Sequence, residues 1–511
     1  MSIDAALLIA RSGLMHTQRA LSNAADNVAN AETEGYTRKR IVAEAVSVSG
    51  QGMGVRSLGP VRDVDTALVN EINKRKSELA AAELRDSVLV RIEEAHGDPA
   101  KGEGLGDLVG KLRTSFIELR HDPSQVVKQQ AIVLNAAQNL TNRFNDLSRV
   151  VGEARQSAHD GIVTEITKVN ATVREIAALT RNIVERTGAS EATADIEDKR
   201  DLALDHLSES IGFKAVRREN GGLLLLGAGG VTIPLNENGD TFSVAPGALS
   251  PAAYYGGAGT IPPIVLAGTD VTPLMSGGRL GEYLRLRDQT LPRYQAELDI
   301  AAVEIADRFE EEGLRLFTDP AGVVPDPNVG YAAPTSTQIG FAGRIQINAE
   351  VRAEVRKLRD GTHVQPPPPA VPWFTPNPVG GPAGFITLID RILTNSFGAS
   401  NSQGSNWGGF ATTGLGPDGS LSSPFGMPQT IEQYGILVTA TQASDSAAAG
   451  AAVETAKQLS DGLQARFTRQ SRVDVDSEMA SLIQLQNAYA ANARVISTAQ
   501  TMWDSLFGSV R

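Results

Sequence analysis

Apolar residues recur every seven positions at both ends of the chain. In the N-terminal repeat these residues are Leu7, Leu14, Leu21 and Val28. In the C-terminal repeat they are Val475, Leu482, Tyr489, Ile496 and Trp503. Apolar or small residues three or four positions later complete an a/d seam in each segment, which predicts an amphipathic helix. A single helix of this kind more often faces a core. The mirrored pair favours a coiled coil between residues 5–29 and 475–506, because terminal segments fray unless something holds them.

The pattern between the two ends predicts long helices and one extended segment. Partial alternation over 37–62 predicts an extended arm or a short hairpin. Apolar residues with helical spacing then predict helices in four stretches: 65–95, 108–119, 124–186 and 195–211. The third has the strongest seam, because its apolar residues step by three and four from Ile162 to Ile183. We therefore expect a helical bundle in this part of the chain.

At Gly212 the composition changes. Glycines punctuate short apolar runs up to about Met275, which is typical of β-hairpins. Helical periodicity returns over 280–316, and a loop-rich stretch runs from 319 to about 428. Its prolines between 366 and 382 predict a stiff extended segment, which we interpret as an ordered surface connection. A ligand for a proline-recognition domain is the alternative. An alanine-rich helix over 431–472 then leads into the C-terminal repeat.

These elements predict a mainly α, elongated protein with several domains and a β-rich insertion. If the terminal helices pair, both termini lie at one end, and the earlier and later helical blocks lie side by side. We expect the β-rich insertion at the opposite end. The predicted domains are a terminal coiled-coil assembly domain (1–62 and 473–511), a helical domain (63–211, 280–318 and 431–472) and an outer β- and loop-rich domain (212–279 and 319–430).

Composition and charge narrow the range of partners and compartments. The formal net charge is −12, with the charges spread along the chain, which disfavours a nucleic-acid partner. The absence of cysteine excludes disulfides and thiolate metal sites. The first residues lack the features of a cleaved signal peptide. No apolar run reaches the roughly 18–20 residues that crossing a bilayer requires, so we expect no membrane insertion. Taken alone, these features predict a soluble cytoplasmic protein.

No arrangement of residues points to catalysis, a metal or a cofactor. The six histidines are scattered, and no metal-binding or nucleophile motif includes them. Glycine-rich segments such as 227–230 and 256–259 lack phosphate-binding spacing, so turns explain them better. Acidic runs such as Glu310-Glu311-Glu312 fit the solvated face of a helix. We therefore expect no cofactor and no enzymatic activity, while a site assembled from dispersed residues stays open.

Short motifs at both ends resemble those of a known family. Residues 27–31 (Asn-Val-Ala-Asn-Ala), followed by Gly35-Tyr36, are similar to the N-terminal signature of the bacterial flagellar rod, hook and hook-associated proteins. Residues 478–483 and 487–496 are similar to the C-terminal signature of that family. Within it, Gly35-Tyr36-Thr37-Arg38 and the stretches 54–65 and 198–202 resemble the hook-associated branch, with Lys199 where glutamine is usual. The matches frame residues 1–315 and 430–511.

The resemblance implies a structural protein at the junction of hook and filament, which polymerises through its terminal helices. It also implies terminal segments that order when they meet neighbouring subunits. The implied partners are further copies of the chain, the hook protein, a second hook-associated junction protein and an export chaperone. The implied location is the extracellular flagellum, reached without a cleaved signal peptide. The alternatives are a hook or distal rod protein, and a secreted enzyme with flagellar-type ends and a site within 212–430.

We expect the assembly interface to combine the two terminal signatures. For Tyr489 and Trp503, packing within the core of one chain explains the residue type as well as contact between subunits does. Polar and glycine residues dominate 27–38, which favours contact between subunits there. The predicted interface residues are Leu7, Leu14, Leu21, Asn27, Val28, Asn30, Gly35, Tyr36, Arg38, Met479, Leu482, Tyr489, Asn492, Ile496, Trp503 and Leu506.

Overall fold

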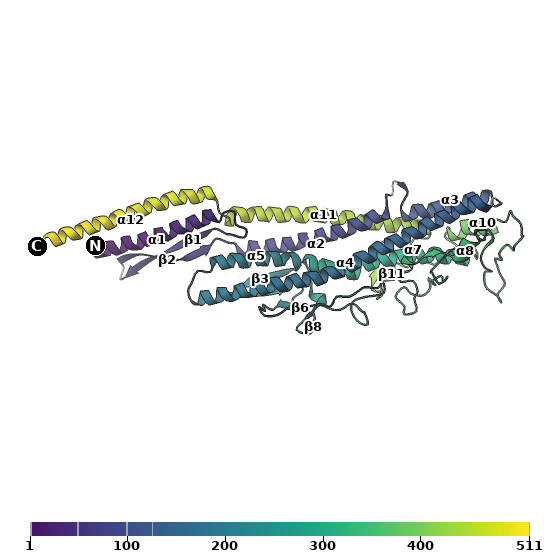
Figure 1. Cartoon of the computed structure of the whole chain (residues 1–511), viewed down its shortest axis with the longest axis horizontal. Helices are drawn as coiled ribbons and strands as arrows, with labels where there is room; N and C mark the ends of the chain where they lie inside the picture. Colours follow the sequence, from purple (N-terminus) through teal and green to yellow (C-terminus); the bar gives the residue numbers. More distant parts are fainter. Residues whose placement is uncertain (1–2, 49–50, 99–100, 125, 510–511) are drawn as a thin grey trace.

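The molecule is elongated, with the first and last helices at the same end of its long axis (Figure 1). The computed structural model describes residues 3–48, 51–98, 101–124 and 126–509. The first two and last two residues of the predicted terminal domain therefore lie outside the described residues. We call residues 3–62 and 473–509 the terminal module and residues 63–472 the rod. The predicted elongated, mainly α architecture is confirmed.

The terminal module has three layers. Helix α1 (Ile3–Ala29) lies between helix α12 (Val475–Ser509) and an antiparallel hairpin of β1 (Lys39–Val48) and β2 (Gln51–Arg62). The helices α1 and α12 run antiparallel (Figure 1). The hairpin approaches α1 so closely that a Cβ at Gly54, where φ is +106°, would lie 2.1 Å from the Ser12 hydroxyl. The predicted pairing of the terminal helices and the predicted hairpin are confirmed.

Long helices run along the rod, as the periodicity predicts. The longest, α4, has 63 residues and buries apolar side chains throughout its length, among them Leu140, Val151 and Ile176. Asp65 caps α2 by accepting hydrogen bonds from the backbone N–H groups of Ala67 and Leu68. The rod's longer helices are α2 (Thr66–His96), α3 (Leu105–His121), α4 (Val126–Gly188), α5 (Ala194–Ser210), α6 (Gly278–Arg285), α7 (Leu291–Glu311) and α11 (Ile431–Ser471).

The middle of the rod has a hydrophobic core of its own. The second half of α4 contributes Ile162 and Val173, and α5 contributes Leu204 and Leu207. Two small antiparallel sheets pack on this helical layer, together with α6. Their strands are β3 (Phe213–Arg217), β4 (Leu223–Gly227) and β5 (Thr232–Ile233) in the first sheet, and β6 (Phe242–Ser243), β7 (Val265–Leu266) and β8 (Thr269–Asp270) in the second. A 3-10 turn, η2 (Thr272–Leu274), follows β8, and a π-helical turn, η3 (Leu286–Thr290), separates α6 from α7.

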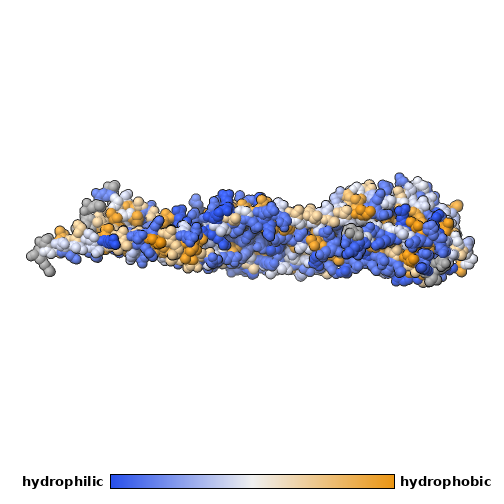
Figure 2. Space-filling model, turned by 90° about the horizontal axis from the view of Figure 1, so that it is seen from above, coloured by the Kyte–Doolittle hydropathy of each residue, from blue (hydrophilic) through white to orange (hydrophobic). Residues whose placement is uncertain are grey.

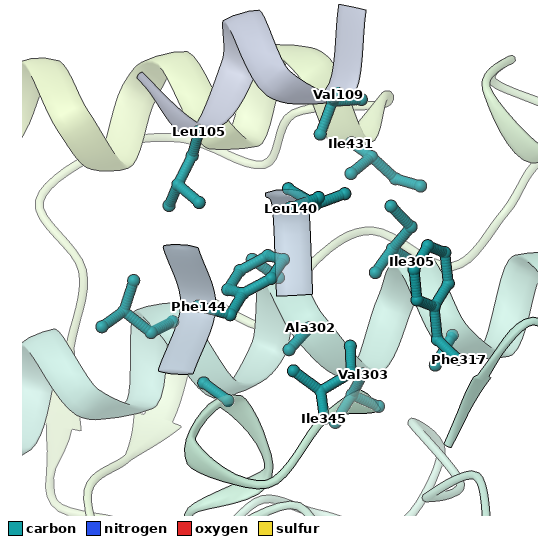
Figure 3. Packing of buried hydrophobic residues seen from close by; sticks show 14 of the residues in the cluster. Leu105, Val109, Leu140, Phe144, Ala302, Val303, Ile305, Phe317, Ile345 and Ile431 are labelled. Carbon is teal, nitrogen blue, oxygen red and sulfur yellow. The ribbon is translucent and has the colours of Figure 1, made fainter. Parts of the chain in front are cut away.

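A second core fills the far end of the rod. Figure 3 shows side chains of α3, α4, α7 and α11 meeting there, including Val109, Phe144, Val303 and Ile431. Residues 319–430 wrap around α7 with short elements and irregular chain. These and the preceding strand are β9 (Phe317–Thr318), η4 (Phe341–Gly343), β10 (Gln346–Ile347), α8 (Ala349–Ala353), α9 (Lys357–Asp360), α10 (Thr387–Arg391), η5 (Ile392–Ser396), β11 (Thr413–Leu415) and β12 (Leu421–Ser422).

The β-rich insertion does not lie at the end opposite the termini, and this prediction is wrong. Residues 212–279 lie beside the middle of the rod (Figure 1), because the apolar faces of their short strands pack on α4 and α5. Residues 319–430 form the far end instead, and their apolar residues, such as Phe341 and Phe410, pack with α7. The two stretches therefore belong to different cores.

The proline-rich stretch 365–382 is only partly a surface connection. Its turn over 367–373 is exposed, but Phe374 and Asn377 are buried. The Phe374 ring packs against Gly313 and Gly361, where a Cβ would lie 2.2 and 2.7 Å from it. The Asn377 side chain donates a hydrogen bond of 2.8 Å to Asp360. These two anchors hold the second half of the stretch in the far-end core.

Apolar surface is most evident over the terminal module and the far end, whereas the middle of the rod is mostly hydrophilic in the same view (Figure 2). None of the helices in the described ranges combines the length and apolar character needed to cross a membrane. The same residues contain no group of three or more His, Asp or Glu side chains placed to hold a metal ion.

Candidate assembly surface and its joint to the rod

The seam between α1 and α12 is built largely of small residues. Ala10 and Ala24 on α1 and Ala499 on α12 are buried. A Cβ on Gly13 would lie 3.0 Å from the Asn492 side-chain oxygen, so the helices approach closely here. On the two helices, eight of the predicted interface residues are half-buried: Leu7, Leu14, Leu21, Val28, Leu482, Asn492, Ile496 and Trp503.

Helix α12 leaves large apolar side chains exposed to solvent. Met479 is 48% exposed, Leu506 is 50% exposed, and Ile483, which the sequence analysis does not select, is 58% exposed. We expect Met479, Tyr489 and Leu506 to face α1 across the seam. This is wrong for the single chain, because they face solvent to a large extent, including Tyr489, which is 39% exposed. At the first of them the neighbouring Glu478 is buried instead, because it pairs with Arg38. These side chains remain predicted contacts between subunits.

The turn after α1 is fixed by one buried amide. The Asn27 side chain donates to the Lys39 backbone carbonyl (2.9 Å) and accepts from the Lys39 backbone N–H (3.2 Å) and the Tyr36 hydroxyl (3.0 Å). Asn23 donates to the same carbonyl at 2.7 Å. Asn30 donates to the Asp26 carbonyl at 2.9 Å and remains partly exposed. Asn27 thus ties the end of the helix to the start of the hairpin.

Gly35 and Arg38 connect this turn to other elements. Gly35 has φ +75° and lies against Leu202 of α5, 3.2 Å from where a Cβ would stand. Such a backbone conformation and so close a neighbour favour glycine. The Arg38 backbone N–H donates to the Ser471 carbonyl at 2.8 Å, and its Nε donates to Glu478 at 2.6 Å. Arg38 therefore holds the corner between α11 and α12.

Charged side chains join the terminal module to α5 of the rod. Asp198 accepts from the Thr37 hydroxyl (2.6 Å), and its carboxylate lies 2.8 Å from Arg62 Nε and 3.0 Å from Lys39 Nζ. Arg62 Nε donates to the Thr37 hydroxyl oxygen at 3.2 Å. Arg62 also donates to Asp201 at 2.6 Å. Lys39, Arg62 and Asp198 are at least nine-tenths buried as side chains. We call this group the Asp198 cluster; it consists of Thr37, Lys39, Arg62, Asp195, Asp198 and Asp201.

Burial and charge act in opposite directions on the two cations of the cluster. Burial alone lowers the pKa of Lys39, but the carboxylates of Asp195 and Asp198 outweigh it and raise that pKa above its ordinary value. Burial likewise opposes ionisation of Arg62, and Asp201 and Asp198 raise its pKa overall. Both side chains therefore stay charged, and removing an acidic partner would leave a buried cation uncompensated.

The structure brings together motifs that the sequence analysis treats separately. Thr37, Arg62 and the 198–202 stretch carry three parts of the family resemblance, and all three meet in or beside the Asp198 cluster. Lys199, the departure from the usual glutamine, is exposed at the rim. The sequence analysis misses Lys39 and Asp198 as joint residues, because nothing in one sequence links positions about 160 residues apart. Asn27, Gly35, Tyr36 and Arg38 make contacts within the chain here, and their role between subunits stays a prediction.

The secreted-enzyme alternative would need a pocket of clustered polar side chains within residues 212–430. A cleft lined by carboxylates lies in this region, at the far end of the rod. Its volume is about 620 Å³, and α7 contributes Glu304, Asp307, Glu310 and Glu311 to its lining. Arg308 pairs with Glu304, and Arg315 pairs with Glu310. Burial, reinforced by the neighbouring carboxylates, raises the pKa of Asp307 to about 8. The sequence analysis interprets Glu310-Glu311-Glu312 as a solvated helix face, which is wrong for Glu312, because this side chain is 1% exposed and pairs with Arg391.

Three families match separate parts of the chain. The flagellar hook-associated protein FlgK helical domain matches residues 89–313. The C-terminal family of flagellar basal body rod FlgEFG proteins matches residues 464–508. The flagella basal body rod protein family matches residues 7–37. The outer two matches cover the paired terminal helices, and the central one covers most of the helices of the rod.

Curated relatives named flagellar hook-associated protein 1 occur in several bacteria. The Salmonella typhimurium protein is 25% identical over 59% of this chain and 55% of its own length, so the chain spans about half of that relative. The Bacillus subtilis protein is 23% identical over 98% of this chain and 97% of its own length. The Escherichia coli protein is also 23% identical, over 97% of this chain and 98% of its own length.

A solved structure, that of the flagellar hook junction protein FlgK from Burkholderia pseudomallei, is similar to 49% of this chain and 46% of that one. Its sequence identity to this chain is 20%, and the TM-score is 0.41.

Proposed function

We propose that this chain, which belongs to the flagellar hook-associated protein 1 family, is a structural subunit that joins the hook to the filament. It polymerises through its terminal module. The observation that carries the proposal is the exposed apolar surface of α12, which includes Met479, Ile483 and Met502. A helix with so much apolar surface in water gains free energy when a neighbour covers it.

The energetics favour burial between subunits. Fully burying a Leu, Ile or Met side chain contributes about 1.5–3 kcal/mol, so a half-exposed one still has roughly half of this to gain. Leu8 and Met15 on α1 are also about half exposed and add to the same module. Neighbouring copies that cover both helices would thus stabilise the module, and any terminal segment that frays in the monomer would order at that step.

The proposed partners follow from the family. They are further copies of this chain, the hook protein, a second hook-associated junction protein and an export chaperone. The proposed location is the extracellular part of the flagellum, reached by export without a cleaved signal peptide. The relatives carry the names of flagellar structural proteins, which supports a role without catalysis.

The test separates assembly from folding. Ile483→Asp places a carboxylate on the exposed face of α12, where the single chain loses little, and the matched control is Gln484→Asp at the adjacent exposed position. We expect Ile483→Asp to be exported and to fail to incorporate, leaving hooks without filaments and filament protein in the medium. The control should support normal filaments. Electron microscopy of flagella in a strain lacking the native gene measures both.

Leu482→Asp and Ile496→Asp test the seam itself. Both positions are half-buried, so the new carboxylate costs several kcal/mol where it stays charged and unpaired. We expect loss of filaments again, here because α12 leaves α1. Normal filament growth in all three aspartate variants would rule out the terminal helices as the assembly element.

A further inference from the structure

No described hydrophobic core crosses from the rod into the terminal module. The two buried clusters of the described chain, with the apolar residues packed around them, all lie between Leu84 and Ala449. The module therefore has no apolar contact of core size with the rod. Two short covalent connections cross the boundary, residues 63–65 and 472–474. Something other than a core must set the angle between module and rod.

The contacts that cross the boundary are mainly polar and charged. Thr37, Lys39 and Arg62 of the module meet a row of carboxylates on α5. Hydrogen bonds depend strongly on angle and distance, whereas the hydrophobic effect is non-directional. The two cations contact the whole row of carboxylates at once: Lys39 lies beside Asp195 and Asp198, and Arg62 lies beside Glu197, Asp198 and Asp201.

The joint is incompletely packed. A crevice of about 140 Å³ lies between the turn at Gly35, α2, α5 and the end of α11, with Asn73 and Phe467 in its lining. The Asn73 side chain is 3% exposed, and its Nδ2 has no hydrogen-bond partner among the described residues. The hydroxyl of Ser471, at the α11 corner, is in the same situation. Buried polar groups are normally satisfied, so these two groups do not help to hold the joint in the arrangement seen here.

We infer that the joint is a hinge whose angle is set by the Asp198 cluster. In the structure the cluster holds the module in line with the rod. Loss of the Asp198 contacts leaves Lys39 held by Asp195 alone and Arg62 by Glu197 and Asp201. With fewer contacts across the joint, the module takes further angles about 63–65 and 472–474. The inference concerns the single chain and does not depend on the proposed function. A junction subunit with an adjustable angle could match two neighbours of different geometry.

The chain is well suited to a distance measurement because it has no native cysteine. Arg11 on α1 and Glu175 on α4 are exposed and lie on opposite sides of the joint. Spin labels on Arg11→Cys and Glu175→Cys report the module–rod distance by pulsed electron paramagnetic resonance. In the otherwise native chain we expect one narrow distance. Asp198→Asn, which keeps the side-chain size, should broaden the distribution or add a second distance.

The matched control is Asp205→Asn. Asp205 lies on the same helix and pairs with Lys76, so its contact stays within the rod. This variant should keep the single distance. Thr37→Val removes the two hydrogen bonds of the Thr37 hydroxyl, to Asp198 and from Arg62, and keeps the ion pairs of Asp198, so it should give a smaller broadening. It replaces Asp198→Asn if that variant has lost its native helix content by circular dichroism. A narrow, unchanged distance in folded Asp198→Asn and Thr37→Val, equal broadening in the control, or a broad distribution in the native chain would each overturn the inference.

Discussion

Helices α7 and α12 have similar apolar patterns and opposite surroundings. On α7, Leu298, Ile305 and Phe309 are fully buried. On α12, Met479, Ile483 and Leu506 are about half exposed. The difference lies in the neighbours: α4, α11 and residues 319–430 enclose α7, whereas α12 packs along α1 at the edge of the molecule. An amphipathic pattern thus indicates that a helix needs a partner, and it does not indicate whether that partner is in the same chain.

This comparison defines what each region contributes. The rod is a pair of closed cores that α4 spans from one to the other, so its stability is internal. In the terminal module, α1 and α12 are buried only in part and leave apolar side chains exposed. Ion pairs join this module to the rod. Changes in the rod should therefore act on folding, and changes on the outer face of the module should act on assembly.

The largest expected effect comes from truncating the centre of the far-end core. The Phe309 ring lies 5.5–5.8 Å from the rings of Phe116, Phe317 and Phe397. Phe309→Ala should reduce the free energy of unfolding by about 3–5 kcal/mol, because it removes buried surface and leaves a cavity. Ile483→Ala on α12 should change it by no more than about 1 kcal/mol, because most of the Ile483 side chain is already exposed. Denaturant titration of the purified full-length variants measures both.

The Ile483 variant tests the comparison more directly. If Ile483→Ala destabilised the monomer as much as Phe309→Ala, this face of α12 would have a buried partner within its own chain. The distinction between closed rod and open module would then fail.

The elements of the fold were largely predictable, but their arrangement was not. Heptads through Leu14 and Leu482 predict the terminal pair, and the steps from Ile162 to Ile183 predict the long helix α4, because local periodicity reports which face of an element is buried. The pattern does not report which neighbour buries it. Strand β4, with Leu225, packs on α4 in the middle of the rod. No local feature of its sequence shows whether the strand lies there or at the far end.

The candidate site likewise has a part that the sequence predicts and a part that it does not. Apolar seam residues such as Ile496 follow from spacing. The pairing of Asp198 with Arg62 depends on three-dimensional proximity, so one sequence does not show it. The sequence analysis assigns the 27–38 motif to contacts between subunits because polar residues dominate it. The structure shows how such residues also serve within one chain, since Asn27 and Thr37 satisfy buried backbone and carboxylate groups.

Asp307 should make the far-end core sensitive to pH. Its pKa is about 8 in the fold against an ordinary value of 3.8, because of burial and then of Glu304, Glu311, Asp326 and Glu310. The unfolded chain therefore binds fewer protons than the fold between these values, and stability falls as pH rises from about 4 to 8. Asp307→Asn cannot ionise. It should stabilise the far end by roughly 1–3 kcal/mol above pH 8 and hardly at all near pH 4.

Thermal unfolding followed by circular dichroism at pH 4, 6 and 9 measures this dependence. Glu153→Gln on the exposed face of α4 is the control, and it should leave the pH profile unchanged. An equal effect of Asp307→Asn at all three pH values would mean that the buried carboxyl is not the titrating group.

Removing the terminal module should have a smaller effect on the rod. Both cores lie within residues 63–471, so this fragment should keep its helix content and unfold cooperatively. Its midpoint should move by only a few degrees, because Asp198 loses its module partners but gains water, and Asp201 keeps its ion pair with Arg217. Circular dichroism and calorimetry measure the change. An unfolded fragment would show that the module is part of the rod's folding unit.

The smallest expected effect concerns the proline turn at the far end. Residues 367–372 are exposed, and hydrogen bonds between the backbones of Gln365 and Phe374 already bring the ends of the turn together. Replacing 367–372 by a short glycine-serine turn should therefore change stability by less than about 0.5 kcal/mol, because closure entropy varies slowly with loop length. Phe374→Ala is the matched variant, since it removes the buried anchor beside the same turn and should cost about 3–5 kcal/mol. Denaturant titration of both proteins gives the energies, and swimming and filament length in cells give the function. If the shortened turn kept its stability and export but lost filaments, the turn would be a junction contact, and exposed surface at the far end would serve assembly as α12 does.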